Sequence, residues 1–211
     1  MRDGKFITIE GIEGAGKSTA IQGLQTLFDH HDINYITTRE PGGTQVAEAI
    51  RNLLLQHHHE CIDPITELLL MFAARRQHVQ NVIMPALQQG AWVLCDRFTD
   101  ATYAYQGSGR GLPRTIIDQL KQMVHCMLHP DLTLLLDVDV ATGLNRAGKR
   151  SAPDRIEQQA DHFFERVRQG YLQCASSEPD RFGIINATEP PQQVMIQIKT
   201  VLQPMLDLHR A

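Results

Sequence analysis

The sequence predicts an α/β domain in which a five-stranded parallel sheet is flanked by helices. Short apolar runs of strand length alternate with longer segments of helical periodicity along the chain. These apolar runs are nearly continuous, which is typical of parallel strands that are buried on both faces. A chain of 211 residues can also bury a sizeable core. We therefore expect residues 1–211 to form one domain.

The strands follow the chain in a regular order. They are FITIE (6–10), NYITTR (34–39), WVLCDR (92–97), LTLLLDVD (132–139) and GIINA (183–187). Helical patterns fill the remaining segments at about 17–30, 44–56, 65–89, 114–127, 157–176 and 191–208. In such sheets, ligands bind at the carboxyl ends of the strands. The loops after residues 10, 39, 97 and 139 are therefore expected to share one edge.

Composition argues against several classes of protein. The net charge of −4 leaves no overall basic face for nucleic acid. No apolar run approaches the ~20 residues of a membrane span, and MRDGKF lacks a signal peptide's apolar core. Neither a nucleic-acid nor a membrane partner is therefore expected.

The cysteines and histidines suggest no structural metal. The four cysteines are widely spaced without a CxxC pair, which favours reduced thiols and a cytoplasmic location. Adjacent helical residues point about 100° apart, so His57, His58 and His59 cannot converge on one ion unless the backbone is irregular. A solvated loop is the simpler interpretation of this run.

The loop after the first strand predicts phosphate binding. Residues 11–18, GIEGAGKS, fit G-x-x-x-x-G-K-[ST] between a strand and a helix. Backbone N–H groups of such a P-loop surround an anion, Lys17 reaches the β- and γ-phosphates, and Ser18 binds Mg²⁺. A glycine-rich turn capping an ordinary helix is the alternative, but the strand and helix around it favour nucleotide. The predicted ATP-binding set is Gly11, Ile12, Glu13, Gly14, Ala15, Gly16, Lys17, Ser18 and Thr19.

Charged residues at other strand ends extend the predicted site. Asp96 ends an apolar strand, as does the Walker-B carboxylate that holds Mg²⁺ directly or through water. Asp137 fits the same pattern, but Asp96 is preferred because Arg97 beside it could grip a second phosphate. Arg39 ends the second strand within TREPGGT (38–44).

Two glycine-containing segments are interpreted as loops. AYQGSGRG (104–111) is expected to be a polar loop in which Gln106 could read a base edge. NRAGKRSAPDR (145–155) contains four basic residues and is expected to be a mobile basic lid, extending to about residue 156. Each segment could instead be a solvent-exposed loop without function. The P-loop favours the lid interpretation, because phosphoryl transfer requires cations.

Together these motifs resemble the bacterial thymidylate kinase family. The resemblance rests on GIEGAGKST, TREPGGT, TELLLMFAARRQHV, DRFTDATYAYQGSGRG, PDLTLLLDV and DRIEQ, in this order, and extends from Phe6 to about residue 190. It implies a P-loop kinase that transfers phosphate from ATP with Mg²⁺ to thymidine 5′-monophosphate (dTMP). A homodimer packed through helices is also implied.

The resemblance assigns roles in phosphate chemistry. Lys17 and Ser18 match the contacts to ATP phosphates and Mg²⁺, and Asp96 matches the acid near the metal. Arg39 and Arg97 match arginines near the acceptor phosphate. Lys17, Asp96 and Arg97 are therefore expected to be catalytic.

Further positions match contacts to the acceptor nucleoside. Glu13 matches the P-loop carboxylate that approaches the 3′-hydroxyl, and Tyr105 the residue that crowds the 2′ position. Arg75 matches the arginine that contacts thymine, and Thr102 and Gln106 lie where neighbours of its polar edge are found.

One position departs from the family pattern. A gapless register places Met71 where the family usually has the phenylalanine that stacks on thymine. A shifted helix would use Phe72 with Arg76 instead, and a side chain in the core is the third possibility. The gapless register is preferred.

The last expectation concerns the residue that supplies the positive charge that the P-loop, which has no arginine, lacks. One branch of the family has an arginine inside the P-loop, where this sequence has Gly14. The other branch supplies it from the lid, which here contains Arg146, Lys149 and Arg150. This sequence resembles the second branch, with Arg150 as the expected catalytic residue and Arg146 as the second choice and an ATP contact.

Other functions are less compatible with the sequence. A regulatory GTPase needs a guanine-reading N-K-x-D, and no Asn-Lys pair occurs. A nucleic-acid ATPase is disfavoured by the acidic net charge. Another nucleoside or nucleoside monophosphate kinase is the main alternative.

Overall fold

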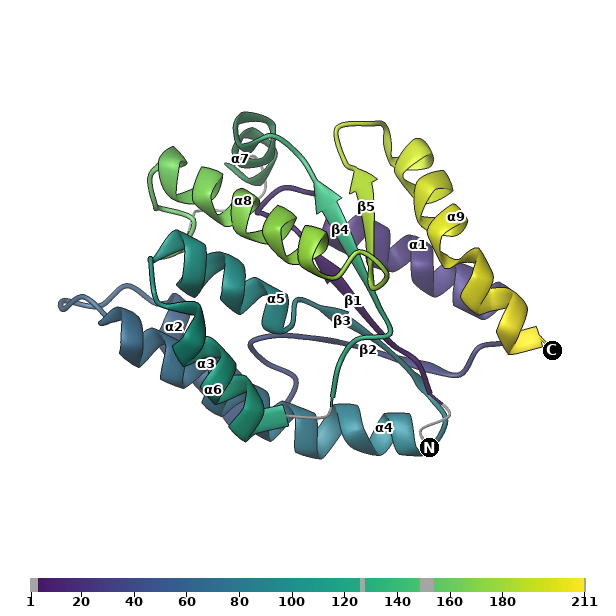
Figure 1. Ribbon diagram of the computed structural model, residues 1–211, viewed down its shortest axis with the longest axis horizontal. Coiled ribbons are helices and arrows are strands. Elements are labelled where there is room, and N and C mark those ends of the chain that lie inside the picture. The colour runs from purple at the N-terminus through teal and green to yellow at the C-terminus, as the bar shows by residue number, and fades with distance from the viewer. Residues whose placement is uncertain (1–3, 126–127, 149–153, 211) are drawn as a thin grey trace.

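A computed structural model describes residues 4–125, 128–148 and 154–210. Its centre is a five-stranded parallel sheet in the order β2-β3-β1-β4-β5 (Figure 1). The strands are β1 (Phe6–Glu10), β2 (Tyr35–Arg39), β3 (Trp92–Asp96), β4 (Leu132–Asp137) and β5 (Phe182–Asn186). The predicted fold class is therefore confirmed.

Helices cover both faces of the sheet. On one side α1 (Lys17–His30) and α9 (Pro191–Arg210) pack together, and on the other α8 (Asp161–Ser177) contacts β4 and β5 (Figure 1). The remaining helical elements are α2 (Gln45–Leu55), α3 (Pro64–His78), η1 (Val79–Ile83), α4 (Met84–Gln88), α5 (Thr99–Thr102), η2 (Tyr103–Gly109), α6 (Arg114–His125) and α7 (Val140–Gly148). No helix in the described ranges is long and apolar enough to cross a membrane.

The order of the strands positions the site. β1 lies between β3 and β4, so the loops that follow β1 and β3 are neighbours at one edge of the sheet. All five residues of β1 are buried, which explains its continuous apolar sequence. Its one central polar side chain is satisfied, because Thr8 Oγ1 and Thr133 Oγ1 lie 2.8 Å apart across the β1–β4 pair.

Two predicted boundaries are corrected by the structure. The expected loop at 104–111 is largely helical, because α5 and η2 continue without a break from Thr99 to Gly109. One of its glycines serves close packing against α8: a Cβ on Gly109 would come within 2.7 Å of the Phe163 ring, and a Cβ on Gly170 of α8 would come within 2.6 Å of Ser108 Oγ. The first residues of the expected lid, 145–148, belong to α7, and residues 149–153 lie outside the described residues.

Smaller differences concern the ends of elements. The single helix expected at 65–89 is divided into α3, a π-helical turn and α4. The fourth strand ends at Asp137 rather than at residue 139. The three cysteines within the described ranges, Cys61, Cys95 and Cys174, are free thiols.

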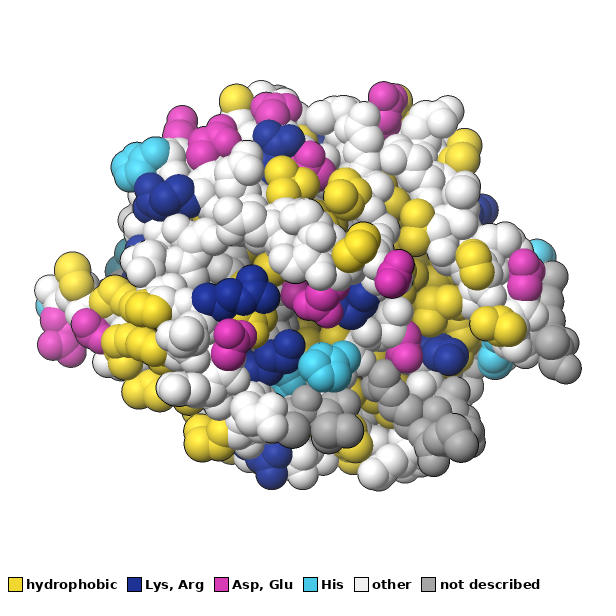
Figure 2. All heavy atoms as spheres, in the orientation of Figure 1, with side chains coloured by type: hydrophobic (Ala, Val, Ile, Leu, Met, Phe, Trp, Pro, Cys, Tyr) yellow, Lys and Arg dark blue, Asp and Glu magenta, His cyan; other side chains and the backbone are white. Residues whose placement is uncertain are grey.

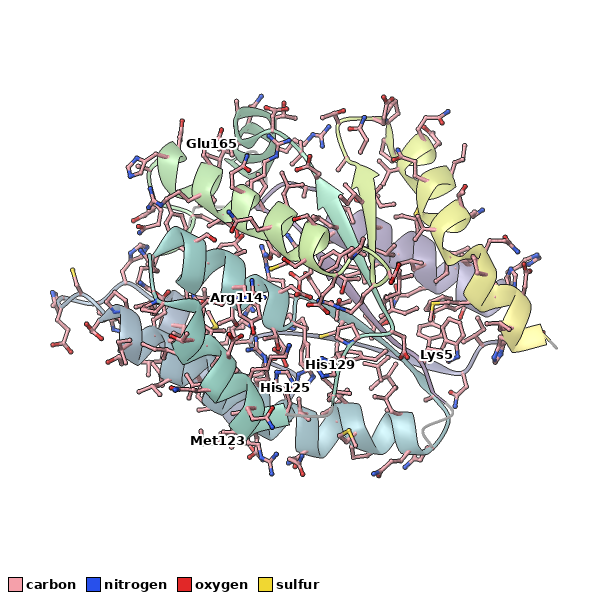
Figure 3. All side chains as sticks on the ribbon, in the orientation of Figure 1. Lys5, Arg114, Met123, His125, His129 and Glu165 are labelled. Atoms are coloured by element: carbon pink, nitrogen blue, oxygen red, sulfur yellow. The ribbon has the colours of Figure 1, made fainter. Side chains whose placement is uncertain are left out.

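Acid is expected to destabilise the fold through His125. This side chain at the end of α6 is buried (Figure 3), with Nδ1 3.1 Å from the Leu128 carbonyl oxygen and Nε2 2.8 Å from Thr99 Oγ1. Burial, followed by the charge of Arg75, lowers the pKa of His125 from 6.5 to about 4. Between these values the unfolded chain binds the proton more tightly than the folded chain does. The free energy of unfolding therefore decreases as the pH is lowered, by about 2 kcal/mol at pH 5.

Urea unfolding at pH 7 and pH 5 measures this contribution. Between pH 7 and pH 5, the free energy of unfolding of His125→Gln should decrease by about 2 kcal/mol less than that of the parent. The control is His59→Gln in the exposed loop after α2, which should behave like the parent. An equal pH dependence in the parent and His125→Gln would contradict the assignment.

Candidate active site

A cavity of about 460 Å³ lies at the edge where β1 and β3 end. It joins the P-loop to α3, α5 and η2, and so combines a phosphate-binding loop with an adjacent polar pocket. Its lining residues are Glu13, Gly14, Gly16, Lys17, Ser18, Thr19, Glu40, Pro41, Arg51, Leu55, Met71, Arg75, Asp96, Arg97, Phe98, Ala101, Thr102, Tyr105, Gln106, Arg146, Asp154, Ile156 and Glu157.

The P-loop runs from β1 into α1 and surrounds the side chain of Lys17. Lys17 begins α1, and its Nζ donates to the carbonyl oxygens of Gly11 and Ile12, 3.0 Å each. Burial, followed by the charge of Arg97, lowers the pKa of Lys17 to about 8. Ser18 and Thr19 in the first turn are exposed to the cavity. The N-terminus of α1 is thus open to an anion.

The middle of the P-loop has no room for a side chain. Gly14 has a φ of 69°, and a Cβ on it would lie 1.9 Å from the carbonyl oxygen of Gly143 in α7. The P-loop therefore packs directly on the helix that leads to the expected lid. An arginine at this position would displace α7, which supports a source of positive charge outside the loop.

Asp96 and Asp137, the two candidate metal ligands, have different environments. Asp137 forms an ion pair with Arg168, with contacts of 2.7 and 2.8 Å to its two oxygens. Asp96 lines the cavity, and its Oδ1 is buried without a hydrogen-bond partner in the described part of the chain. A buried carboxylate oxygen without a donor suits a cation, whereas the Asp137 carboxylate is already neutralised. The structure therefore favours Asp96.

Asp96 and Ser18 fit the donor set for Mg²⁺. The described residues hold no group of three or more His, Cys, Asp or Glu side chains around one point. Such a group is not required, because Mg²⁺ at phosphate sites uses one or two protein oxygens together with phosphates and waters. A serine hydroxyl and an unpaired carboxylate oxygen provide these two ligands.

Arg97 and Glu13 form a charged cluster with Tyr105. Arg97 Nη2 donates to Glu13 Oε1 at 2.9 Å, and the Tyr105 hydroxyl lies 2.7 Å from both Glu13 oxygens. The Arg97 guanidinium also lies 4.9 Å from the centre of the Tyr105 ring. The three side chains line the cavity beside the P-loop, as the sequence predicted.

Arg75 is rigidly held at the opposite end of the cavity. Its Nε donates to Glu40 Oε2 at 2.6 Å, and its Nη1 donates to Thr102 Oγ1 at 3.0 Å. His78 Nδ1 lies 3.0 Å from the other Glu40 oxygen. Despite burial, Arg75 and His78 lower the pKa of Glu40, so this carboxylate stays charged beside the arginine.

The choice between Met71 and Phe72 follows from their surroundings. Met71 lines the cavity, whereas Phe72 does not and is 2 % exposed in a cluster with Leu68 and Tyr103. The preferred gapless register agrees with this arrangement. Arg76 also turns away, since its Nη1 donates to the Val124 carbonyl oxygen at 2.8 Å.

Gln106 lines the cavity in a fixed orientation. Its Nε2 donates to Glu67 Oε1 at 2.9 Å, which commits the amide nitrogen to a buried carboxylate. The same carboxylate accepts hydrogen bonds from Arg110 and Arg155. Gln106 belongs to η2, Arg110 follows it directly, and Arg155 lies near the end of the expected lid, so Glu67 ties these segments to α3.

Several predicted residues do not line the cavity. Besides Phe72, these are Gly11, Ile12, Ala15 and Arg39. The first three are buried in the P-loop and contribute its backbone. Arg39 pairs with Glu48 at 2.8 Å, and Arg51 of α2 lines the cavity near it instead.

The structure describes only one of the two expected lid arginines. Arg146 lines the cavity, and its guanidinium donates to the carbonyl oxygens of Ala187 (2.8 Å) and Thr188 (3.4 Å). Arg150 lies outside the described residues, as does Lys149.

Other lining residues were not found from the sequence. They are Glu40, Pro41, Arg51, Leu55, Phe98, Ala101, Asp154, Ile156 and Glu157. Glu40 and Pro41 lie within the quoted TREPGGT motif, and Asp154, Ile156 and Glu157 lie within DRIEQ, so the motifs marked their segments. Arg51 and Leu55 belong to no motif, and only the packing of α2 brings them to the site.

The fold and the site define a P-loop phosphotransferase. A P-loop after the first strand adjoins a second pocket that contains Arg75 and Arg97, in a sheet of order β2-β3-β1-β4-β5. The chain belongs to the thymidylate kinase family, whose model (Thymidylate kinase) matches residues 9–198.

Known thymidylate kinases are similar to this chain over nearly its whole length. A thymidylate kinase of Teredinibacter turnerae is 51 % identical, covering 96 % of this chain and 99 % of the relative. One from Methylococcus capsulatus is 49 % identical over 99 % of this chain and its own full length. The crystal structure of thymidylate kinase from Ehrlichia chaffeensis superimposes with a TM-score of 0.78 at 34 % identity, covering 94 % and 98 % of the two chains.

Proposed function

We propose that this chain transfers the γ-phosphoryl group of ATP to dTMP, giving thymidine 5′-diphosphate for DNA precursor synthesis. The observation that carries this proposal is a single cavity shared by the P-loop and by Met71, Arg75 and Arg97 in a member of the thymidylate kinase family. The cytoplasm is the proposed location, because free thiols persist there.

The donor half of the site uses the P-loop. On binding ATP, Lys17 exchanges its two backbone carbonyl partners for phosphate oxygens, and the N-terminus of α1 adds backbone N–H donors. Ser18 and Asp96 are proposed to hold Mg²⁺, which neutralises charge on the β- and γ-phosphates. Arg146 lies on the donor side and is proposed to contact ATP.

The acceptor half positions the 5′-phosphate and the sugar. Arg97 is proposed to bind the acceptor phosphate and hold it in line with the γ-phosphoryl group. Two cations, Lys17 and Arg97, then flank the transferred group, whose oxygens gain charge as it moves. Glu13 is proposed to accept a hydrogen bond from the 3′-hydroxyl, and the Tyr105 ring to exclude a 2′-hydroxyl.

The base is proposed to bind between α3 and η2. Met71 offers a polarizable thioether face to the ring. Arg75 retains two donor hydrogens beyond its contacts with Glu40, Thr102 and the Phe98 carbonyl, and these can reach a carbonyl of thymine. The Gln106 amide nitrogen is held by Glu67, so its carbonyl oxygen is the group left to accept from the base.

The acceptor is tested by steady-state assays with dTMP, dUMP, UMP, CMP and thymidine. The highest kcat/KM is expected for dTMP and a lower one for dUMP, which lacks the methyl group. Thymidine should not be phosphorylated, because it lacks the phosphate that Arg97 binds. A preference for UMP, CMP or thymidine would replace this proposal with another nucleotide or nucleoside kinase.

The role of Glu13 predicts a cost for a 3′-deoxy acceptor. The carboxylate is 11 % exposed and accepts from Arg97 and Tyr105, which leaves room for one more donor. Removing the 3′-hydroxyl should lower kcat/KM by roughly 1–3 kcal/mol in transition-state free energy, because a buried acceptor loses its partner. Comparing dTMP with 3′-deoxy-dTMP measures this cost, and Glu13→Ala should abolish most of it. Equal kcat/KM values in the parent would contradict the contact.

A homodimer is proposed to form through α2, α3 and α6. Exposed hydrophobic side chains on these adjacent helices are Val46, Leu53, Ile65, Leu69 and Met123. Figure 2 shows hydrophobic side chains gathered on the side that α2 and α3 form, and Figure 3 shows Met123 at the surface of α6. An exposed apolar patch of this kind suits the same patch on a second copy.

Light scattering after size exclusion measures the oligomeric state. The parent should have the mass of two chains, and Leu69→Glu should shift it towards one. The matched control is Ile196→Glu on α9, where a side chain of similar exposure (54 % against 52 %) lies away from the patch. A monomeric parent, or dissociation by both variants, would contradict this surface.

A further inference from the structure

Arg97 has a backbone conformation that its neighbours must stabilise. Its φ is 68°, in the left-handed region that residues other than glycine rarely adopt, at a cost of about 1 kcal/mol or more. Arg97 N donates to the Ile9 carbonyl oxygen at 3.0 Å, and Phe98 N donates to Glu10 Oε1 at 2.6 Å. The carboxylate of Glu10, at the end of β1, thus holds the turn that carries Arg97.

Among the hydrogen bonds of the Arg97 guanidinium, one goes to a residue outside the P-loop. Nη1 donates to the Gly11 carbonyl oxygen and to the Tyr171 hydroxyl, each at 2.8 Å, while Nη2 donates to Glu13. Glu13 is assigned to the sugar and lies within the cavity. Tyr171, on α8, does not line the cavity and is 1 % exposed. Its hydroxyl is therefore available to fix the arginine whether or not nucleotide is bound.

The Tyr171 hydroxyl is itself oriented by Glu10. It donates its single hydrogen to Glu10 Oε2 at 2.8 Å, so a lone pair faces Arg97 Nη1. Burial and the charge of Asp100 raise the pKa of Glu10 to about 8. Glu10 Oε2 accepts from the Tyr171 hydroxyl in this bond, as it does in the carboxylate and in the acid protonated at Oε1. The buried Glu10 carboxylate thus acts on Arg97 at two places. It holds the backbone turn through Phe98 N, and it orients the guanidinium through Tyr171.

We propose that Glu10 and Tyr171 are positioning residues for the acceptor phosphate. Glu10 holds the strained turn at Arg97. The Tyr171 hydroxyl, oriented by the same carboxylate, holds the Arg97 guanidinium. Neither touches a nucleotide, and both act through Arg97. This inference rests on the proposed function, since it requires that Arg97 bind the phosphate of dTMP.

Tyr171→Phe is the direct test, because it removes one hydroxyl and keeps the buried ring. The Kd for dTMP should rise about tenfold, as expected for a lost hydrogen bond to a charged group. The Kd for ATP should stay within about twofold, because Lys17 and the P-loop backbone are unaffected. Tyr103→Phe is the matched control: its hydroxyl also donates to a carboxylate, Asp118 Oδ1 at 2.5 Å, but Tyr103 does not line the cavity. It should bind dTMP like the parent.

A double-mutant cycle separates this role from a general effect on folding. In an Arg97→Ala background, Tyr171→Phe should change the dTMP Kd by less than about twofold, because its only route to the phosphate is gone. Calorimetry with dTMP gives all four affinities, and thermal unfolding shows that each variant is folded. A similar loss in both backgrounds, or no loss in the parent background, would overturn the proposal.

Glu10→Gln supplies a second route to the same conclusion. The amide oxygen can still accept from Phe98 N, but the amide nitrogen would donate to Tyr171 and reverse its hydrogen bond. The dTMP Kd should again rise about tenfold, and Tyr171→Phe should add little to it. Additive losses would refute the relay, and an unchanged dTMP Kd in Glu10→Gln would refute it even if Tyr171→Phe is unstable. A parent that does not bind or phosphorylate dTMP would instead refute the proposed function.

Discussion

Lys17→Ala should lower kcat on the order of 10³-fold or more while leaving the protein folded. The ammonium group is the cation at the start of α1, and its hydrogen-bond partners among the described residues are two backbone carbonyls. Removing it therefore breaks no ion pair between described residues. Alanine is also a strong helix former at the first residue of α1. The loss should appear in the chemical step, since charge on the γ-phosphoryl oxygens loses its partner.

Single-turnover and steady-state rates with ATP and dTMP measure this effect. Lys199→Ala on α9 is the matched control, because Lys199 is exposed and far from the P-loop in sequence. Its rates should equal those of the parent, and the melting temperatures of all three proteins should be similar. Near-normal turnover of Lys17→Ala would remove the P-loop from the mechanism.

Arg150→Ala should lower kcat by about 10²–10³-fold, the range of arginine fingers and oxyanion donors, with a smaller change in dTMP affinity. Arg150 itself lies outside the described residues, and the proposal rests on what surrounds the donor site. Gly14 has no room for an arginine beside Gly143. Arg146 is already engaged by the carbonyls of Ala187 and Thr188. Within the expected lid, Lys149 and Arg150 are then the further candidates for a cation at the transferred group.

Separate variants of the three lid cations test this assignment. We expect kcat to fall most for Arg150→Ala, less for Arg146→Ala and least for Lys149→Ala. Closure of the lid over ATP would also exclude water, so Arg150→Ala should raise the ratio of ATP hydrolysis to phosphoryl transfer. If all three variants turn over like the parent, the lid does not supply the missing charge.

Local patterns in the sequence determined most of the fold. The continuous apolar strands, the helical periodicity between them and the glycine-rich P-loop each depend on neighbouring residues. They therefore predicted the parallel sheet correctly and placed the P-loop between β1 and α1. Gly109 was misleading, because it permits close packing of η2 against Phe163 and Val167 of α8 rather than a loop. Gly170, more than 60 residues later in sequence, provides the other half of that contact.

Only the tertiary structure decided which side chains meet in the site. Asp96 and Asp137 fit the same strand-end pattern, but Arg168 neutralises Asp137 and leaves Asp96 unpaired. Met71 and Phe72 are adjacent in sequence, and the packing of α3 turns one to the cavity and the other to the core. The support of Arg97 by Glu10 and Tyr171 joins residues 161 positions apart. Such contacts depend on how helices settle on the sheet, and short-range sequence patterns contain no information about that packing.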